Sequence, residues 1–192
     1  PNATLDMCKE FITFAKECGY EGFEFCYDDS VFDPSKISKS FREELLEVAK
    51  THDIVFSSVA TGVFWKYNLG STDESIRKRG IEYLKMGIEL AHDLEAKVLL
   101  IVPAVADPKI PYDKMYRISQ ESVKSQANYA EDHGVIIAIE NVWNKFLYSP
   151  MEFRRFIEEI GHEYVQAYLD LGNIVNIGYP EHWIELLKDM IA

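Results

Sequence analysis

Two carboxylates at the ends of two apolar segments are the residues best placed to do chemistry. Glu140 follows the run Val135-Ile-Ile-Ala-Ile, and Asp170 follows Val165-Gln-Ala-Tyr-Leu thirty residues further on. Each run is rich in β-branched or aromatic residues, which indicates a buried parallel strand. In parallel α/β sheets and barrels, ligands bind at the carboxyl ends of the strands. The pair therefore predicts one acidic site formed by two successive βα units.

Each acid also has a purely structural explanation. Glu140 could end its strand and cap the next helix, and Asp170 could open an Asx-turn ahead of Gly172. For either residue alone the structural explanation is the better one. Matching positions in successive units favour a shared function for the pair.

The elements that must position these acids repeat along the chain. Strands are expected to begin near residues 22, 54, 97, 135 and 165, each after a segment with helical spacing of apolar side chains. Six helices are predicted, over residues 5–18, 38–51, 73–94, 112–133, 150–160 and 180–191. We expect Asn2 or Thr4 to cap the first helix, Ser71 or Thr72 the third, and Ser149 the fifth.

This alternation predicts a single parallel α/β domain over residues 1–192. The pattern by itself fits either a (β/α) barrel or an open doubly wound sheet. A closed barrel has eight strands and about 250 residues. Five strands are too few to close one, so a barrel would be incomplete.

Composition narrows the partners. The formal net charge is −12, from 32 acidic and 20 basic side chains without a basic stripe. Such a chain repels phosphate backbones, so we expect no nucleic-acid partner. No apolar run approaches the roughly 20 residues that a membrane span needs, and the first residues show no signal-peptide pattern. The odd set of 3 cysteines without CxxC spacing indicates reduced thiols, and we expect a cytoplasmic protein.

One loop carries aromatic side chains at the expected ligand-binding end of the sheet. Residues 60–72 follow the second predicted strand and include Phe64 and Trp65. These side chains could form the wall of a polar pocket. They could equally fold back onto the core, and composition alone leaves both alternatives open.

The sequence resembles the xylose isomerase-like TIM barrels over nearly its whole length. The most specific stretches are Ile139-Glu-Asn-Val-Trp-Asn-Lys-Phe146, Ser149-Pro-Met-Glu-Phe-Arg-Arg-Phe-Ile157, Tyr168-Leu-Asp-Leu-Gly-Asn173 and Gly178-Tyr-Pro-Glu-His-Trp-Ile184. They are most similar to the sugar-phosphate isomerase/epimerase branch, which includes hexulose-6-phosphate isomerase and L-ribulose- or L-xylulose-5-phosphate 3-epimerase. The resemblance implies an incomplete TIM-type barrel that lacks its first strand and its last two.

The resemblance also implies a metal site and its ligands. Such enzymes hold one divalent metal through a Glu, an Asp, a His and a Glu at successive strand ends. Glu140 and Asp170 match the first two, whereas the other two would lie beyond residue 192. Mn²⁺ or Mg²⁺ is the expected ion, with Zn²⁺ as a further option. His182 is the nearest histidine, but its place at a helix start favours a capping or solvent-facing role.

Four further residues complete the predicted site. Glu24 matches a position that often contacts substrate, and Asn173 matches one that reaches the sugar. Asn144 and Trp65 lie in loops after predicted strands and are the other candidates for substrate binding.

The implied reaction explains these residue types. Moving a proton at the carbon beside a ketose carbonyl requires a base at that carbon and a cation at the developing enediolate oxygen. Glu140 is the candidate base, and a divalent metal held by carboxylates is the candidate cation. We therefore expect a metal-dependent isomerase or epimerase that acts on a ketose or ketose phosphate.

Two alternatives belong to other classes. An endonuclease IV-like DNA repair barrel has the same architecture, but it uses three zinc ions and more histidines, and the acidic charge opposes it. The other alternative is a truncated, non-catalytic barrel that binds a sugar or pairs with another chain through its exposed strand edges. Such pairing includes a homo-oligomer.

Overall fold

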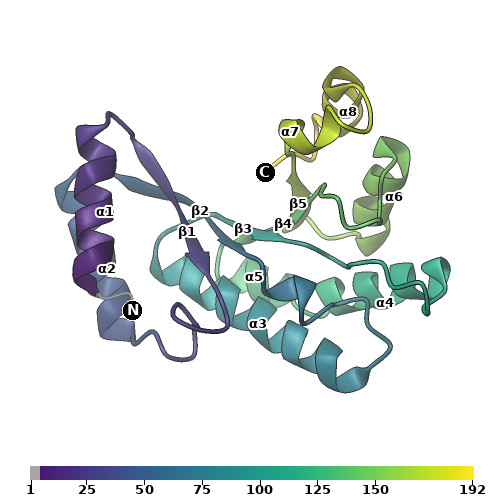
Figure 1. Cartoon of the computed structure of the whole chain (residues 1–192), viewed down its shortest axis with the longest axis horizontal. Helices are drawn as coiled ribbons and strands as arrows, with labels where there is room; N and C mark the ends of the chain where they lie inside the picture. The colour runs from purple at the N-terminus through teal and green to yellow at the C-terminus, as the bar shows by residue number, and fades with distance from the viewer. Residues whose placement is uncertain (1–4) are drawn as a thin grey trace.

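Five parallel strands form one sheet whose spatial order follows the chain order, β1-β2-β3-β4-β5. The computed structural model describes residues 5–192 (Figure 1). The strands are β1 (Gly22–Tyr27), β2 (Val55–Thr61), β3 (Val98–Ile101), β4 (Ile136–Glu140) and β5 (Val165–Tyr168). All five predicted strands are therefore present, and their parallel pairing is confirmed.

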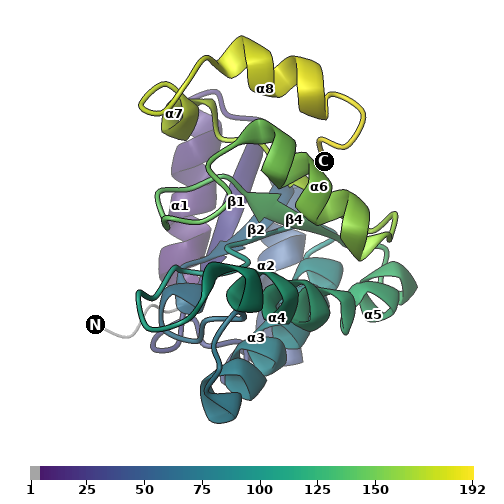
Figure 2. The ribbon, with the colours of Figure 1, turned by 90° about the vertical axis from the view of Figure 1, so that its right-hand side faces the viewer.

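The helices lie on the outer side of the curved sheet (Figure 1). They are α1 (Leu5–Glu17), α2 (Lys39–Thr51), α3 (Glu74–Asp93), α4 (Tyr112–Lys124), α5 (Ala127–Asp132), α6 (Pro150–Ile160), α7 (Leu171–Ile174) and α8 (Pro180–Leu187), with a 3-10 turn, η1 (Val63–Trp65). The turned view shows α6 between α4 and α8 (Figure 2). The end of the sheet with β1 and α1 and the end with β5 and α6–α8 face each other across the concave side (Figure 1).

The core fills the space between sheet and helices. Leu99 and Ile101 on β3 and Ile137 and Ile139 on β4 are completely buried. These four side chains alternate along their strands, so they lie on the face of the sheet that the helices cover. Facing them, α3 contributes a stripe that includes Leu84 and is spaced as the sequence predicts.

The single helix predicted over residues 112–133 is wrong, because it breaks into α4 and α5. Ser122 Oγ lies 2.8 Å from the carbonyl oxygens of both Leu69 and Ile118, which share its single donor proton, and Ser125 Oγ donates to the carbonyl oxygen of Ser122. Hydroxyl groups that bond to nearby carbonyls compete with the helical ladder. The six predicted helices also do not include the short helix α7.

Helix caps differ in part from expectation. Asp73, rather than Ser71 or Thr72, caps α3, because its side chain accepts hydrogen bonds from the next turn of backbone. Ser149 occupies the N-cap position of α6 as predicted, ahead of a proline in the first turn, but its side chain accepts no capping hydrogen bond from that helix. The predicted caps Asn2 and Thr4 lie outside the described residues.

After α8 the chain returns to the sheet. Ile191 forms a parallel bridge with Ala167 of β5. The backbone N–H of Ala167 donates to the carbonyl of Met190, and the N–H of Ala192 donates to the carbonyl of Ala167. Residues 190–192 therefore cover part of the outer edge of β5. No helix within residues 5–192 has the length and apolar character needed to cross a membrane.

Candidate active site

Three carboxylates lie at the concave face, two of them at the carboxyl ends of adjacent strands and the third in the middle of β1. Glu140 is the last residue of β4, Asp170 follows β5, and Glu24 comes from β1. All three side chains are partly buried. Burial of Glu140, together with the negative charges of Asp170 and Glu24, raises the pKa of Glu140 to about 7. The predicted pair is therefore brought together, and Glu24 joins it electrostatically.

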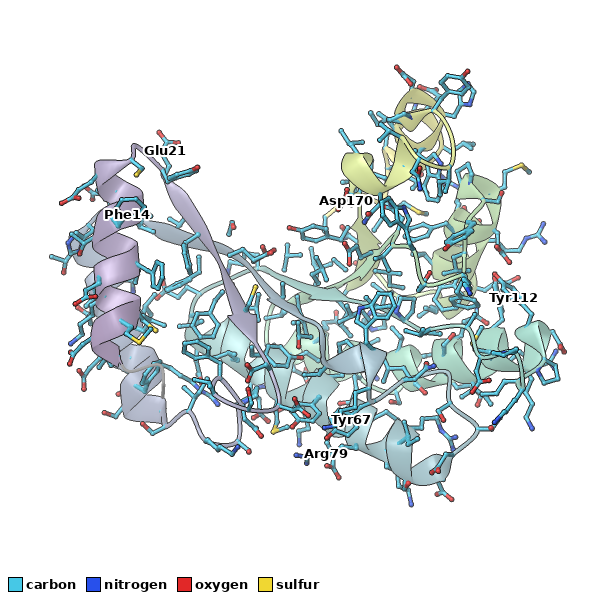
Figure 3. The ribbon with its side chains drawn as sticks, viewed as in Figure 1. Phe14, Glu21, Tyr67, Arg79, Tyr112 and Asp170 are labelled. Atoms are coloured by element: carbon cyan, nitrogen blue, oxygen red, sulfur yellow. The ribbon has the colours of Figure 1, made fainter. Side chains whose placement is uncertain are left out.

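Asp170 is held by the short helix that follows it (Figure 3). Its Oδ1 accepts a hydrogen bond of 2.8 Å from the backbone N–H of Asn173, so Asp170 is the N-cap of α7. The structural explanation for Asp170 is thus correct for one oxygen. In the described part of the chain, only Oδ1 of this carboxylate accepts a hydrogen bond, so Oδ2 is available to a ligand.

Asn141 joins the two strand ends. Its Nδ2 donates to the carbonyl oxygen of Asp170 at 2.8 Å, and its Oδ1 accepts from the backbone N–H of Asp170 at 2.9 Å. One buried amide therefore satisfies both polar groups of the Asp170 backbone. This contact fixes Asp170 relative to Glu140, which directly precedes Asn141.

Asn173 provides a second connection between the same segments. Its Nδ2 donates to the carbonyl oxygen of Asn141 at 3.0 Å and lies 3.5 Å from Glu140 Oε1. The carbonyl of Asn173 accepts from Trp143 Nε1 at 3.0 Å. The predicted residue Asn173 therefore lies beside Glu140, at the limit of a hydrogen bond.

Glu24 is anchored by two hydroxyl groups. Its Oε2 accepts hydrogen bonds from Ser58 Oγ at 2.6 Å and from Tyr168 Oη at 2.9 Å. Burial is the main cause that raises the pKa of Tyr168, so its hydroxyl keeps the proton that it donates. Neither Ser58 nor Tyr168 was selected from the sequence.

In the aromatic loop, one of the two neighbouring side chains folds onto the core and the other is exposed. Phe64 is completely buried, as expected of a side chain that folds back onto the core. Trp65, in η1, is 49% exposed. The exposed indole is free to contact a ligand, and its role in substrate binding stays a prediction.

The hydrogen bonds of the Asn144 side chain go to loop backbone and not to the acids. The side chain is 3% exposed, with Nδ2 donating to the carbonyl oxygen of Ala104 at 2.7 Å and Oδ1 accepting from the N–H of Phe146 at 3.1 Å. These contacts join the loops after β3 and β4. Its role in substrate binding stays a prediction, and its observed contacts are those of a loop anchor.

Two oxygen ligands fit the first part of a site for a hard cation. Glu140 and Asp170 supply carboxylates, which Mg²⁺ and Mn²⁺ favour, whereas Zn²⁺ sites more often include nitrogen or sulfur. Residues 5–192 hold no group of three or more His, Cys, Asp or Glu side chains arranged for a metal. His182 is exposed, with its ring 5.5 Å from the ring of Tyr179. A cation here would rest on two side chains of this chain.

A curved parallel sheet with acids gathered at the carboxyl ends of its strands is the arrangement of (β/α) barrels. Residues 12–192 match the family model described as "Xylose isomerase-like TIM barrel". The chain therefore belongs to the xylose isomerase-like TIM barrel family, and the expectation of an incomplete barrel is confirmed.

The relatives found by sequence match this chain over only part of their own length. The chain is 24% identical over 172 residues to the putative L-ribulose-5-phosphate 3-epimerase SgbU of Haemophilus influenzae, a match that covers 86% of this chain and 59% of the relative. It is 21% identical over 165 residues to L-ribulose-5-phosphate 3-epimerase UlaE of Salmonella heidelberg, covering 85% and 58%. The chain thus spans less than two thirds of these curated relatives.

Solved structures show the same fold. D-psicose 3-epimerase of Clostridium cellulolyticum H10, solved with D-tagatose, matches with a TM-score of 0.83 and 21% identity, covering 96% of this chain and 65% of that one. An L-ribulose 3-epimerase matches with a TM-score of 0.77 and 19% identity, covering 92% and 58%. At this identity the likeness establishes the barrel architecture.

Proposed function

We propose that this chain carries the carboxylates of a divalent-metal-dependent isomerase or epimerase that acts on a ketose or ketose phosphate through an enediolate. The observation that carries the proposal is the position of Glu140 and Asp170 on two adjacent strand ends, with the pKa of Glu140 raised to about 7. The names of the relatives, which are ketose and ketose-phosphate 3-epimerases, support the substrate class.

Glu140 is the base in this proposal. A carboxylate with a pKa near neutrality is suited to take a proton from carbon and to return it. Asp170 Oδ2 and a Glu140 oxygen would hold the cation, which supplies positive charge opposite the oxygen that becomes negative. Asn141 keeps the two acids at a fixed separation by binding the Asp170 backbone on both sides.

The remaining residues would bind substrate. Glu24 Oε1 and the Asn173 amide are polar groups near Glu140 that can accept from or donate to sugar hydroxyls. Trp65 offers an exposed aromatic face for the apolar side of a sugar ring. These assignments extend the predicted site to a small polyhydroxylated substrate.

Calorimetric titration of Mn²⁺ into the 192-residue chain tests the metal site. We expect binding that Asp170→Asn weakens at least tenfold, because one of two charged ligands is lost. Asp132→Asn is the matched control, since Asp132 is exposed on α5. Equal affinities in all three proteins, or no binding by the folded wild type, would contradict a site at these residues.

Solvent exchange tests the chemistry separately. A ketose incubated with the protein and Mg²⁺ in D₂O should acquire deuterium at the epimerised carbon, as followed by ¹H NMR. Glu140→Gln should abolish this incorporation because it removes the base and, with it, one of the two proposed metal ligands. A comparison of free L-ribulose with L-ribulose 5-phosphate shows which substrate class is used. Incorporation that persists in Glu140→Gln would assign the base elsewhere.

A further inference from the structure

One hydrogen bond spans the concave face from one end of the sheet to the other. Tyr168, at the carboxyl end of β5, donates to Glu24 of β1, and the two residues are 144 positions apart in the chain. The strands β1 and β5 are not neighbours, because β2, β3 and β4 lie between them. The same Tyr168 is the register partner of Glu140 on β4. Tyr168 therefore connects the strand end that carries Glu140 to Glu24.

The two carboxylate oxygens of Glu24 have different surroundings. Ser58 Oγ and Tyr168 Oη both donate to Oε2, and Ser58 is 4% exposed. The two O–H donors occupy Oε2, and their directions fix the rotation of the carboxylate. Among the described residues, both side-chain donors to the Glu24 carboxylate bond to Oε2 and none to Oε1. Oε1 is the acceptor left for a ligand.

We infer that Tyr168 is a positioning residue, which with Ser58 orients Glu24 so that Glu24 Oε1 accepts a hydroxyl group of the bound ketose. The inference rests on the proposed function and adds a specificity determinant to it. A sugar hydroxyl is the donor that this acceptor selects, and an analogue with hydrogen in its place leaves the carboxylate unsatisfied.

The hydroxyl of Tyr168 can be removed without removing its ring. Tyr168→Phe keeps the packing on β5 and deletes only the bond to Glu24. Tyr164→Phe is the matched control, because Tyr164 immediately precedes the same strand and its ring lies 6.3 Å from the His162 ring, at the end of β5 away from Glu24. Ser58→Ala and Ser58→Thr form a second pair, which differ in whether a hydroxyl remains.

The test is a titration with D-tagatose in the presence of Mg²⁺, followed by the ¹³C resonance of the Glu24 carboxyl group. Glu24→Gln assigns that resonance in protein with labelled glutamate. We expect the ketose to shift it in the wild type and in Tyr164→Phe. In Tyr168→Phe and Ser58→Ala about tenfold more ketose should be needed, as is typical for one lost hydrogen bond to a charged group, while Ser58→Thr should retain most of the affinity.

Deuterium incorporation gives a second readout. Tyr168→Phe should raise KM about tenfold and change kcat much less, because the base is untouched. If the wild type responds to the ketose and Tyr168→Phe matches Tyr164→Phe in affinity and KM, the positioning role is wrong while the proposed function stands. If the wild type itself shows neither a shifted resonance nor incorporation, the proposed function fails, and the positioning role fails with it.

Discussion

At Glu140, burial and neighbouring charge act in the same direction. The side chain loses solvent at the end of β4, and Asp170 and Glu24 add negative potential, so the pKa rises from 4.5 to about 7. The folded chain therefore keeps a proton between pH 4.5 and 7 that the unfolded chain releases. By linkage, stability is highest below the lower value and declines as pH rises to the upper one.

We predict that Glu140→Gln removes this decline in the metal-free protein. Its Tm at pH 8 should exceed that of the wild type by roughly 2–4 °C, about 1 kcal/mol after allowing for solvent screening of a half-buried group. At pH 4.5 the two proteins should agree. Thermal unfolding in EDTA from pH 4.5 to 8 measures the difference. Glu121→Gln, an exposed change on α4, should follow the wild type throughout.

Asn141 also contributes to the stability of the folded chain. Asn141→Ala leaves both the N–H and the carbonyl of Asp170 without their partner, so we predict a loss of about 2 kcal/mol in the free energy of unfolding. Urea denaturation measures it. Asn176→Ala, at an exposed position, is the control and should change stability by less than about 0.5 kcal/mol. Equal stabilities of the two variants would show that water replaces the amide.

At the scale of elements, the loop after β2 depends on its contact with α3. Gly80 lies in α3, and a Cβ there would overlap the backbone carbonyl of Tyr67. The ring of Tyr67 in turn stacks on Tyr83 with centroids 5.1 Å apart. A glycine in mid-helix lowers helix propensity, and here it permits the close approach that places this loop.

Gly80→Ala should therefore destabilise the protein despite the better helix propensity of alanine. We predict a loss of about 1–3 kcal/mol from overpacking. Gly62→Ala is the comparison, because no atom lies within 4 Å of the position of its Cβ and its φ of −92° suits any residue. Chemical denaturation of both variants decides: a Gly80→Ala protein as stable as Gly62→Ala would mean that the loop moves away at little cost.

How far the sequence predicts these elements depends on the range of the interactions. The five strands were visible because each is a short apolar run, and Glu140 and Asp170 were visible because they end two of them. Asn141 escaped selection, although it directly follows Glu140, because the sequence does not show that its amide faces Asp170. Asn144, of the same type and three residues further on, turns instead toward Ala104.

Tyr168 illustrates the same limit across a longer range. A side chain two positions before Asp170 lies on the same face of a strand, which is the one signal that could have selected it. Its partner on β1 depends on the curvature of the whole sheet, which no local pattern contains. Likewise, one acceptor of the Ser122 hydroxyl near the end of α4 is the carbonyl of Leu69, which lies 53 residues earlier in the chain.

At the scale of the molecule, the net charge of −12 opposes the DNA repair alternative. We predict no mobility shift of an abasic-site DNA duplex at physiological salt, with or without Zn²⁺. Lowering the salt should not produce a complex, because the chain has no basic stripe that would release counterions. A shift that strengthens at low salt would contradict this expectation and revive the endonuclease alternative.

The order of the strands has a consequence for how the chain acquires its structure. Since each strand pairs with the one before it, every added unit finds its neighbour already in place as synthesis proceeds from the N-terminus. Each pairing closes one βα unit rather than the whole sheet, although parallel pairing is slow in general. The bond between Tyr168 and Glu24 is the exception, because its ends are 144 residues apart. The Glu24 side of the site would thus be completed only with β5, and a chain stalled before β5 would have β1 to β4 paired but Glu24 held by Ser58 alone.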